Sequence, residues 1–379
     1  MQYTIGIDGN EANVLNRVGS NVYAYELLHA LHEWLNETQK FSVIVYISAA
    51  PLSDMPAETA WWQYRVVPHV PFWTLWRLPL ELWQKRDIQL FFSPGHYVPS
   101  SAPVPVVPTI MDLAFEFFSD HFKRKDYWQL HFLTQYSGTQ GQHIFAISEA
   151  TKNDVIEQYR RDPEDVTVVY PAAPRNIVEP SAATRQAVRE RFGIQKPFLV
   201  YVGTVQPRKN IDRLVGAFEV VRQNGWDGEL VLAGKIGWKS DSIVQRIETS
   251  SARDHIRQLG FVTDEEKYAL LMEAEMLVLP GLYEGFGIPP LEALLLGTIP
   301  VVSDASSLPE VVGESGIKVD PESVEDIARG IEEVLACSPA EKKKMIAALQ
   351  VHASQFSWEK SGALVGETLW KLLSHTHAL

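Results

Sequence analysis

The chain has 379 residues, which is enough for two domains of roughly 150–200 residues each. Hydrophobic residues make up 46% of it and charged residues 21%, proportions that indicate a folded globular protein and exclude a disordered one. The formal net charge of −13 disfavours a nucleic-acid-binding protein, and the single cysteine, Cys337, excludes an internal disulfide framework and a thiolate metal cage.

Short apolar runs alternate with helical patterns in the first half of the chain, which is typical of βαβ units with a parallel sheet. The predicted strands are Thr4–Asp8, Phe41–Ile47, Leu90–Ser93, Val104–Ile110, Ile144–Ile147 and Val166–Tyr170. Helical spacing of apolar residues predicts helices over Asn21–Leu35 and Thr151–Tyr159. We assign residues 1–175 to a first Rossmann-like domain.

Residues 61–86 are unusual because tryptophans and cations are interspersed there. The residues are Trp61, Trp62, Trp73, Trp76 and Trp83, with Arg65, Arg77, Lys85 and Arg86. One interpretation is a core helix whose cations extend along apolar surface to reach water. The other is an aromatic acceptor platform or a membrane-interface surface, where indole rings favour a half-wet position.

A proline-containing stretch without a strong apolar run predicts a linker over residues 176–195, with a short helix up to Gly193. Residues 196–355 are expected to form a second domain, and residues 356–379 a terminal segment whose amphipathic helix, Trp358–Leu373, returns to the first domain. The strands predicted in the second domain are Phe198–Gly203, Glu229–Ala233, Ile256–Phe261, Met276–Leu279, Ile299–Ser303 and Gly316–Val319. The predicted fold class is therefore α/β, with two facing doubly wound sheets and a ligand beyond the carboxyl ends of their strands.

The stretch after Met276–Leu279 carries the clearest indication of function. Glu284 and Glu292 flank a glycine turn, Gly285-Phe286-Gly287-Ile288, that leads into a helix with prolines at its start. Gly285 and Gly287 would permit positive φ, and Pro289 or Pro290 suits the first helical position. Backbone N–H groups and the helix dipole suit a phosphate, while the carboxylates suit sugar hydroxyls. A solvated turn glutamate and an ordinary helix-surface charge are the alternative.

A second motif, Gly203-Thr204-Val205-Gln206-Pro207-Arg208-Lys209-Asn210, follows the first strand of the second domain. Arg208 and Lys209 would lie at the carboxyl end of that strand, where they could neutralise a diphosphate leaving group. Asn210 is a good N-cap for the helix expected after it. A surface charge pair would explain the two cations equally well.

Polar residues also follow the strands of the first domain. Gly19 precedes a helix and could bring N–H groups to a phosphate, although a plain turn explains it as well. His96, Tyr97 and Asp112 lie after predicted strands and are candidates for contact with the sugar or the acceptor, against the alternative of packed or solvated residues.

Several catalytic patterns are absent from the sequence. It contains no Asp-x-Asp, no H-E-x-x-H, no C-x-x-C and no G-x-S-x-G. We therefore expect no metal site and no cofactor. We also expect a cytoplasmic protein, because no signal peptide pattern is visible and no apolar run approaches the roughly 20 residues that span a bilayer.

Together these motifs resemble the retaining glycosyltransferases of family 4, which have the two-domain GT-B fold. The resemblance covers nearly the whole chain and is strongest between Tyr201 and Glu310. In motif style it is closest to bacterial mannosyltransferases of surface-polysaccharide assembly. It implies a first domain on the acceptor side and a second domain that binds a nucleotide-sugar donor, with GDP-mannose as the first expectation and UDP-sugars and dTDP-rhamnose as alternatives.

The resemblance also implies roles for individual residues. Lys209 would bind the diphosphate, Glu284 the donor sugar and Glu292 the ribose, with Arg208 and Asp112 as further catalytic candidates. The backbone of Gly260, Phe261 and Val262 would line the base pocket, and Gly19, Gly203, Thr204, Gly285, Phe286, Gly287 and Ile288 would complete the donor site. Thr204 stands where the family often has arginine, and Met111 where it has a sugar-contacting histidine.

The expected activity is transfer of a hexose to a hydroxyl of a glycan or lipid-linked acceptor, without metal. The expected partners are the donor and the acceptor, with no nucleic acid and with peripheral membrane contact through residues 61–86 as an option. Two alternatives stay open at this point. One is a sugar-nucleotide 2-epimerase on the same scaffold, and the other is a sugar-nucleotide-binding protein impaired in catalysis by Met111.

Overall fold

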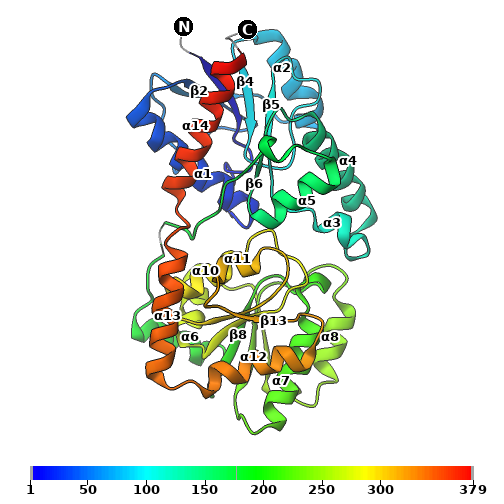
Figure 1. The fold of residues 1–379 in the computed structure, drawn as a ribbon, viewed down its shortest axis with the longest axis vertical. Helices are drawn as coiled ribbons and strands as arrows, with labels where there is room; N and C mark the ends of the chain where they lie inside the picture. Colours follow the sequence, from blue (N-terminus) through cyan, green and yellow to red (C-terminus); the bar gives the residue numbers. More distant parts are fainter. Residues whose placement is uncertain (1–2, 176, 377–379) are drawn as a thin grey trace. The chain divides into compact units, whose positions relative to one another are not determined.

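The computed structural model describes residues 3–175 and 177–376, which form two α/β units (Figure 1). The first unit contains the chain up to Leu113, Trp128–Pro174 and the chain from Phe356 onward, and the second contains Ala114–Tyr127 and Arg175–Gln355. Asn176, at the start of the predicted linker, and residues 1–2 and 377–379 lie outside the described residues. The division into an acceptor side and a donor side stays a prediction.

The first unit is built on a parallel seven-stranded sheet with the order β3-β2-β1-β4-β5-β6-β7. Its strands are β1 (Thr4–Asp8), β2 (Ser42–Ile47), β3 (Trp62–Val66), β4 (Leu90–Ser93), β5 (Val106–Ile110), β6 (Ile144–Ala146) and β7 (Val166–Val168). Six of these strands were predicted, and β3 was not. The strand order reverses between β1 and β4, which makes their carboxyl ends the topological switch point of this sheet.

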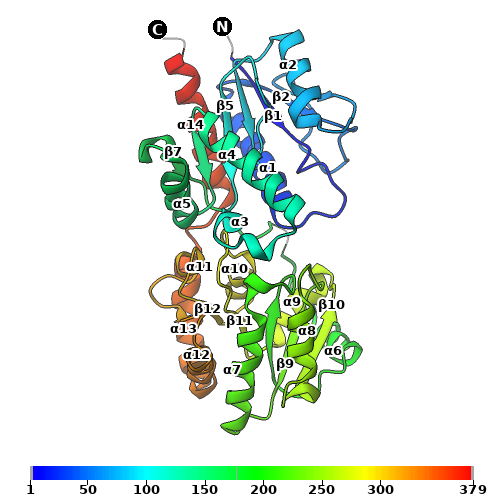
Figure 2. The same cartoon turned by 90° about the vertical axis from the view of Figure 1, so that its right-hand side faces the viewer.

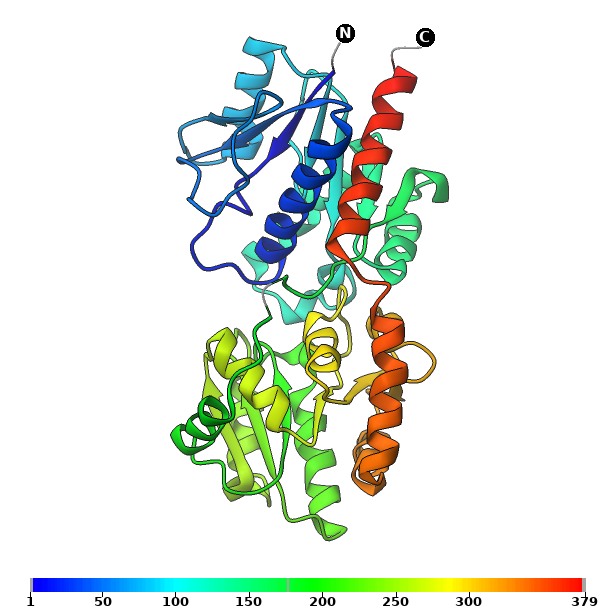
Figure 3. The ribbon, with the colours of Figure 1, turned by 90° about the vertical axis from the view of Figure 1, so that its left-hand side faces the viewer.

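The terminal helix packs against the first unit, as the sequence predicts. Helix α14 (Trp358–Thr376) runs beside α1 (Ser20–Thr38), the red and blue neighbours in Figure 3. Gly362 permits this approach, because a Cβ atom there would lie 2.6 Å from the backbone of Ala30. The indole of Trp358 donates a hydrogen bond of 2.9 Å to the carbonyl of Ala173 and anchors the helix start.

The interpretation of the Trp-rich segment as one core helix is wrong. Trp62 lies in β3, because this stretch of aromatic and β-branched residues pairs with β2. Helical structure starts only after Phe72, as a π-helical turn (η1, Trp73–Arg77) that continues into α2 (Leu78–Lys85). Trp73 is buried in the core, whereas Trp76 and Trp83 are exposed to solvent.

The remaining helices of the first unit lie between its later strands. They include α4 (Arg124–Gln140), whose first turn is grouped with the second unit, and α5 (Glu149–Tyr159). Ser148 caps α5 by accepting a hydrogen bond of 3.0 Å from the N–H of Thr151. The short α3 (Ala114–Phe117) and the 3₁₀ turn η2 (Ser119–His121) belong to the second unit.

The second unit contains a parallel six-stranded sheet with the order β10-β9-β8-β11-β12-β13. Its strands are β8 (Phe198–Val202), β9 (Glu229–Ala233), β10 (Ile256–Gly260), β11 (Met276–Leu279), β12 (Pro300–Ser303) and β13 (Ile317–Val319), all of which were predicted. The strand order reverses between β8 and β11. The carboxyl ends of these two strands are therefore the switch point of the second sheet.

Helices cover both faces of this sheet, so β8, β9, β11 and β12 are fully buried runs. Figure 2 shows α7 and α8 over the β9 side. The helices are α6 (Ala182–Arg191), α7 (Ile211–Gln223), α8 (Asp241–Glu248), α9 (Asp264–Glu273), α10 (Ile288–Leu295), α11 (Leu308–Val312), α12 (Val324–Ala336) and α13 (Pro339–Ala353). Helix α6 is the short helix predicted before Gly193. Among the residues described, no helix combines the length and apolar character needed to cross a membrane.

Candidate functional site

The two motifs singled out in the second domain meet at the switch point of its sheet. The loop Gly203–Asn210 follows β8, and the loop from Pro280 to Gly287 follows β11. The two loops are joined by a backbone hydrogen bond of 2.8 Å from the N–H of Leu282 to the carbonyl of Arg208. Seventy-five positions separate Arg208 from Tyr283 in sequence, and the strand order brings them together.

A cluster of three charges forms the centre of this site. Glu284 accepts a short hydrogen bond from the ammonium of Lys209, and its other oxygen lies 3.5 Å from the guanidinium of Arg208. The three side chains are 11–17% exposed. Arg208 also donates a hydrogen bond of 2.8 Å to the carbonyl of Tyr283, which fixes its direction. The site therefore holds two cations and one carboxylate in a mostly buried position, a preformed arrangement for an anionic ligand.

Three serines hold the backbone of the loop around Glu284 in place. The Ser307 hydroxyl lies 2.8 Å from the carbonyl oxygens of both Glu284 and Phe286 and can donate its one proton to either, and Ser306 donates a hydrogen bond of 2.6 Å to the carbonyl of Glu284. Ser303, at the end of β12, donates to the carbonyl of Gly281 at 2.6 Å. Because these carbonyls are directed toward the serines, the loop keeps one conformation and the Glu284 carboxylate one direction.

Asn210 directly precedes α7, as predicted, but it does not cap the helix through a side-chain hydrogen bond. The residue does stand at the cap position, but its backbone is left-handed, with φ of 62°. Its side-chain amide instead donates hydrogen bonds of 2.9 Å to the carbonyl of Pro280 and 2.6 Å to that of Pro321. A buried amide with two carbonyl acceptors in reach satisfies both its N–H donors there, and Asn210 thereby ties the loops together.

The glycine turn before α10 uses only one of its two glycines in the predicted way. Gly287 has a φ of 111°, whereas Gly285 is not among the glycines with positive φ. A Cβ atom on Gly287 would approach the side chain of Leu308 to 2.6 Å, so the position demands glycine on two grounds. The helix begins at Ile288, with Pro289 second in it, and Gly287 is its N-cap without a side-chain cap. Of the first four helical residues only Ile288 and Leu291 carry a backbone N–H, since positions 289 and 290 are prolines, and no side chain caps this helix end.

Glu292 is the most deeply buried carboxylate of the site. Its side chain is 2% exposed, and its Oε1 accepts a hydrogen bond of 2.7 Å from the ammonium of Lys267 on α9. Burial raises the pKa of Glu292, and Lys267 opposes that effect. Burial disfavours the charge on Lys267 as well, but the carboxylate outweighs it, so the pKa of Lys267 is raised. The pair is held as a mutually stabilised ion pair, which rules out an ordinary helix-surface charge at Glu292.

The residues predicted for the base pocket lie at the end of β10. Gly260 has a φ of 70°, and its carbonyl accepts a hydrogen bond of 2.8 Å from the N–H of Gly234. Phe261 is largely exposed, and the ammonium of Lys235 lies 4.9 Å from its ring centroid. Gly203 faces Gly234 so closely that a Cβ on Gly234 would lie 1.9 Å from the Gly203 carbonyl oxygen. An exposed ring beside strand ends offers a stacking surface for a planar group.

A second group of polar residues lies at the switch point of the first sheet, and the sequence analysis missed two of them. Asp8 ends β1, and Glu11 in the following loop accepts a hydrogen bond of 2.6 Å from the side chain of Asn21 in α1. Gly19 is the N-cap of α1, with φ of 54° and open space where a Cβ would stand. Their place directly after the first strand was the available signal for Asp8 and Glu11.

Asp8 makes the first unit sensitive to pH. Burial, and next the neighbouring Glu11, raise its pKa from 3.8 to about 7, against the opposing effect of hydrogen bonds from Asn10. The folded state thus binds a proton more tightly than the unfolded state, so stability falls as pH rises from about 4 to about 7. We predict that Asp8→Asn flattens this dependence and raises the free energy of unfolding more at pH 8 than at pH 5, measured by urea denaturation. An unchanged pH dependence would contradict the assignment.

The three acceptor candidates lie after β4 and β5. His96 is partly buried, with an Nδ1 atom that has no hydrogen-bond partner, and burial lowers its pKa while Asp112 opposes that shift. The rings of His96 and Tyr97 are 6.1 Å apart. Met111 is buried, and its carbonyl accepts a hydrogen bond of 3.4 Å from Thr151. The structure thus places His96 within the electrostatic reach of Asp112, at the strand ends where both were predicted.

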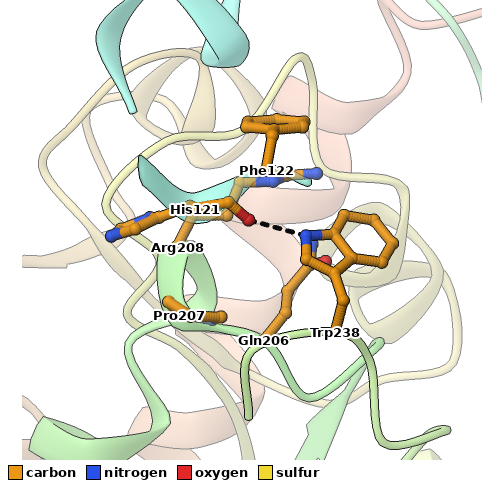
Figure 4. Close-up of a pocket in the computed structure, with 6 residues that line it drawn as sticks. All are labelled: His121, Phe122, Gln206, Pro207, Arg208 and Trp238. Carbon is orange, nitrogen blue, oxygen red and sulfur yellow. Dashed lines mark hydrogen bonds between the residues drawn. The ribbon is translucent and has the colours of Figure 1, made fainter. Parts of the chain in front are cut away.

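A small pocket beside Arg208 includes three residues, His121, Phe122 and Trp238, that belong to no motif described above (Figure 4). It is lined by His121, Phe122, Gln206, Pro207, Arg208 and Trp238. The indole of Trp238 donates a hydrogen bond of 2.6 Å to the carbonyl of His121 and so joins η2 to the loop after β9. No short-range pattern links positions 121 and 238, which is why only the structure reveals this contact.

The described residues hold no group of three or more His, Cys, Asp or Glu side chains placed to bind one metal ion. The charged groups of the site are the cations and carboxylates described above.

Comparison with known proteins agrees with this arrangement. Residues 184–350 match the family described as glycosyl transferases group 1. O-antigen chain mannosyltransferase B of Escherichia coli is 28% identical over 283 residues, which are 74% of each chain. Sucrose-phosphate synthase from Thermosynechococcus elongatus has a similar fold, with a TM-score of 0.74 at 16% identity over 99% of this chain and 100% of that one. HepE of Anabaena, solved in complex with UDP-glucose, gives a TM-score of 0.70 at 18% identity over 97% and 99%.

The fold is that of the GT-B glycosyltransferases, with two Rossmann-like parallel sheets. Residues 184–350 match the group 1 glycosyl transferases, and this match indicates a glycosyltransferase.

Proposed function

We propose that this glycosyltransferase moves mannose from a nucleoside-diphosphate donor to a hydroxyl of a growing glycan or glycolipid, with retention of anomeric configuration, as in family 4. The observation that carries the proposal is the cluster of Lys209, Arg208 and Glu284 at the switch point of the second sheet. Two cations match the diphosphate, and a carboxylate beside them matches sugar hydroxyls. The similarity to an O-antigen mannosyltransferase supports mannose as the sugar.

The proposed donor site extends from this cluster in two directions. The N–H groups around Gly287 and Ile288, at the start of α10, receive the distal phosphate or the sugar, together with the backbone of Gly285 and Phe286. Glu292 binds the ribose hydroxyls, with Lys267 keeping it charged. The base lies by Gly260, Phe261 and Val262, and Gly203 and Thr204 border the phosphates.

In the proposed reaction the protein positions the reactants and stabilises the leaving group. The bond from the anomeric carbon to the diphosphate oxygen breaks, and a bond to the acceptor oxygen forms on the same face. The acceptor proton passes to the departing diphosphate, whose new charge is stabilised by Lys209 and Arg208. No metal takes part in this proposal, because the two cations supply the positive charge.

The acceptor side of the proposal rests on the first unit. Asp112, His96 and Tyr97 are proposed to orient the acceptor hydroxyl, and Gly19 to approach the phosphates from the N-terminus of α1. Asp8 and Glu11, at the same strand ends, add carboxylates that bind hydroxyls. Transfer in the cytoplasm, to a lipid-linked glycan, is part of the same proposal.

A panel of nucleotide sugars tests the choice of donor. The protein is heated with GDP-mannose, UDP-glucose or dTDP-rhamnose, since a bound ligand raises the midpoint of unfolding with the logarithm of its saturation. We expect GDP-mannose to give the largest rise, and Lys209→Met to abolish it while Lys196→Met, at an exposed pair with Asp227, retains it. A rise with UDP-glucose alone, the nucleotide sugar bound to HepE, would overturn GDP-mannose as the donor. No observation on this chain favours the epimerase.

A further inference from the structure

A row of apolar side chains lies exposed on one side of η1 and α2. Trp76, Leu80 and Trp83 follow each other at intervals of four and three positions, which places them on one helical face, and Phe72 directly precedes the first helical turn. Phe72 is 70% exposed, Trp76 74%, Leu80 52% and Trp83 46%. Single exposed apolar residues are ordinary, but a continuous row of this size indicates a surface that contacts something apolar.

Phe72, at the start of this row, combines a strained backbone conformation with a ring that is exposed to solvent. Phe72 adopts a left-handed conformation, with φ of 60°, which is a rare choice for a bulky residue. The next turn is π-helical rather than α-helical. Trp73, one position on, is buried, so the helix is anchored in the core by one ring and presents its neighbours outward.

Most charges around the row are positive, although the whole chain carries −13, and the exposed carboxylate of Asp87, directly after Arg86, is paired with Arg65. Lys85 and Arg86 are exposed at the end of α2, and Arg77 lies within the row. The guanidinium of Arg86 is 4.8 Å from the ring centroid of Trp83, and the Trp83 indole donates a hydrogen bond of 2.7 Å to the carbonyl of Ser101. The carboxylate on α2, Glu81, is buried and 3.3 Å from Arg77.

We propose that this face, made of Phe72, Trp76, Leu80 and Trp83 with Lys85 and Arg86 at its end, docks on the surface of an anionic lipid bilayer. Indole and phenyl rings insert at the level of the headgroups, and the cations meet the anionic lipids. A second copy of the chain fits less well, because the same face of that copy would offer Lys85 and Arg86 no unpaired carboxylate: Glu81 is paired with Arg77 and Asp87 with Arg65. The inference does not depend on the donor site.

Flotation with lipid vesicles tests the proposal on the full chain. We expect the protein to float with vesicles containing about a third anionic lipid and far less with purely zwitterionic ones. The variant Phe72→Ser/Trp76→Ser/Leu80→Ser should lower the bound fraction about ten-fold or more. Lys85→Glu/Arg86→Glu should lower binding to anionic vesicles at least about ten-fold, since each cation contributes roughly a factor of five. Val351→Ser, at an exposed apolar position on α13, should change nothing.

Circular dichroism and the thermal midpoint serve as controls for folding, because the substituted side chains are exposed. Donor-induced stabilisation should be unchanged in all of these variants, which separates this proposal from the donor assignment. Absence of flotation of the wild-type chain, or equal flotation of wild type and triple variant, would overturn the proposal. A concentration-dependent dimer that the triple variant abolishes, without lipid binding, would assign the face to a second copy and overturn it as well.

Discussion

Replacing Lys209 by methionine is expected to lower the rate of sugar transfer by about 10²–10³-fold, the usual effect of removing one donor that stabilises developing negative charge. Methionine retains most of the apolar stem and removes only the ammonium that contacts Glu284. Arg208 lies 3.5 Å from the same carboxylate, so Glu284 keeps one cationic neighbour and the fold should survive.

The kinetic pattern distinguishes transition-state stabilisation from simple binding. Loss of a contact made mainly to the leaving group lowers kcat, whereas loss of uniform binding raises KM alone. The comparison is made by steady-state transfer assays on Lys209→Met and on Lys196→Met, whose lysine pairs with Asp227 at the surface. Turnover of Lys209→Met equal to that of the wild type at saturating donor would remove Lys209 from the catalytic site.

Replacing Lys267 by methionine is expected to lower the free energy of unfolding by about 3–5 kcal/mol, the cost of leaving one partner of a buried ion pair without the other. The Glu292 carboxylate is 2% exposed and lies 2.7 Å from the Lys267 ammonium. Lys267 also lies 3.0 Å from Asp264, but that carboxylate is exposed and remains solvated without it. The loss therefore arises almost entirely from Glu292, and urea denaturation measures it.

The pH dependence identifies the cause of that loss. Burial already raises the pKa of Glu292, and without Lys267 its neutral form becomes still more favourable in the folded state. The difference in the free energy of unfolding between Lys267→Met and the wild type should therefore shrink as pH falls and Glu292 takes up a proton. The double variant Lys267→Met/Glu292→Gln should recover most of the stability at pH 8, because no buried charge remains. Equal destabilisation at pH 5 and pH 8 would show that lost packing, not the unpaired carboxylate, is responsible.

The strands and the position of the donor motifs could be predicted because both depend on local patterns. A fully apolar run such as Phe198–Val202 defines a buried parallel strand, and the motif after it must then lie at the carboxyl edge of the sheet. This reasoning placed Lys209 and Glu284 at strand ends. Their direct contact could not be derived, because it depends on β8 and β11 being neighbours in the sheet.

Partners distant in sequence were not predictable from patterns. Nothing near Glu292 indicated Lys267, which arrives from another helix, and nothing near Glu284 indicated Ser307 as the residue that fixes its backbone. Asn210 stands at the predicted N-cap position, but its side-chain contacts could not be predicted. Its residue type favours capping, but two carbonyl acceptors contributed by other loops compete successfully for its amide.

The composition of the Trp-rich segment, residues 61–86, could not predict its structure, because the segment divides between a strand and a helix. Five tryptophans suggested one environment, yet Trp62 belongs to a strand, Trp73 to the core and Trp76 to the exposed face. The exposed residues within the helix, Trp76, Leu80 and Trp83, recur at helical spacing, and this spacing is visible in the sequence. The boundary between strand and helix, near Phe72, was the missing information.

The most direct test of the account is transfer itself. The purified protein is incubated with GDP-mannose carrying ¹³C at the anomeric carbon and with a mannose-terminated oligosaccharide, and the product is followed by NMR and mass spectrometry. The account predicts an acceptor longer by one hexose, joined through the same anomeric configuration that the donor had. An inverted linkage would contradict retention, and a donor that is bound but not transferred to this acceptor would contradict the proposed mannosyl transfer.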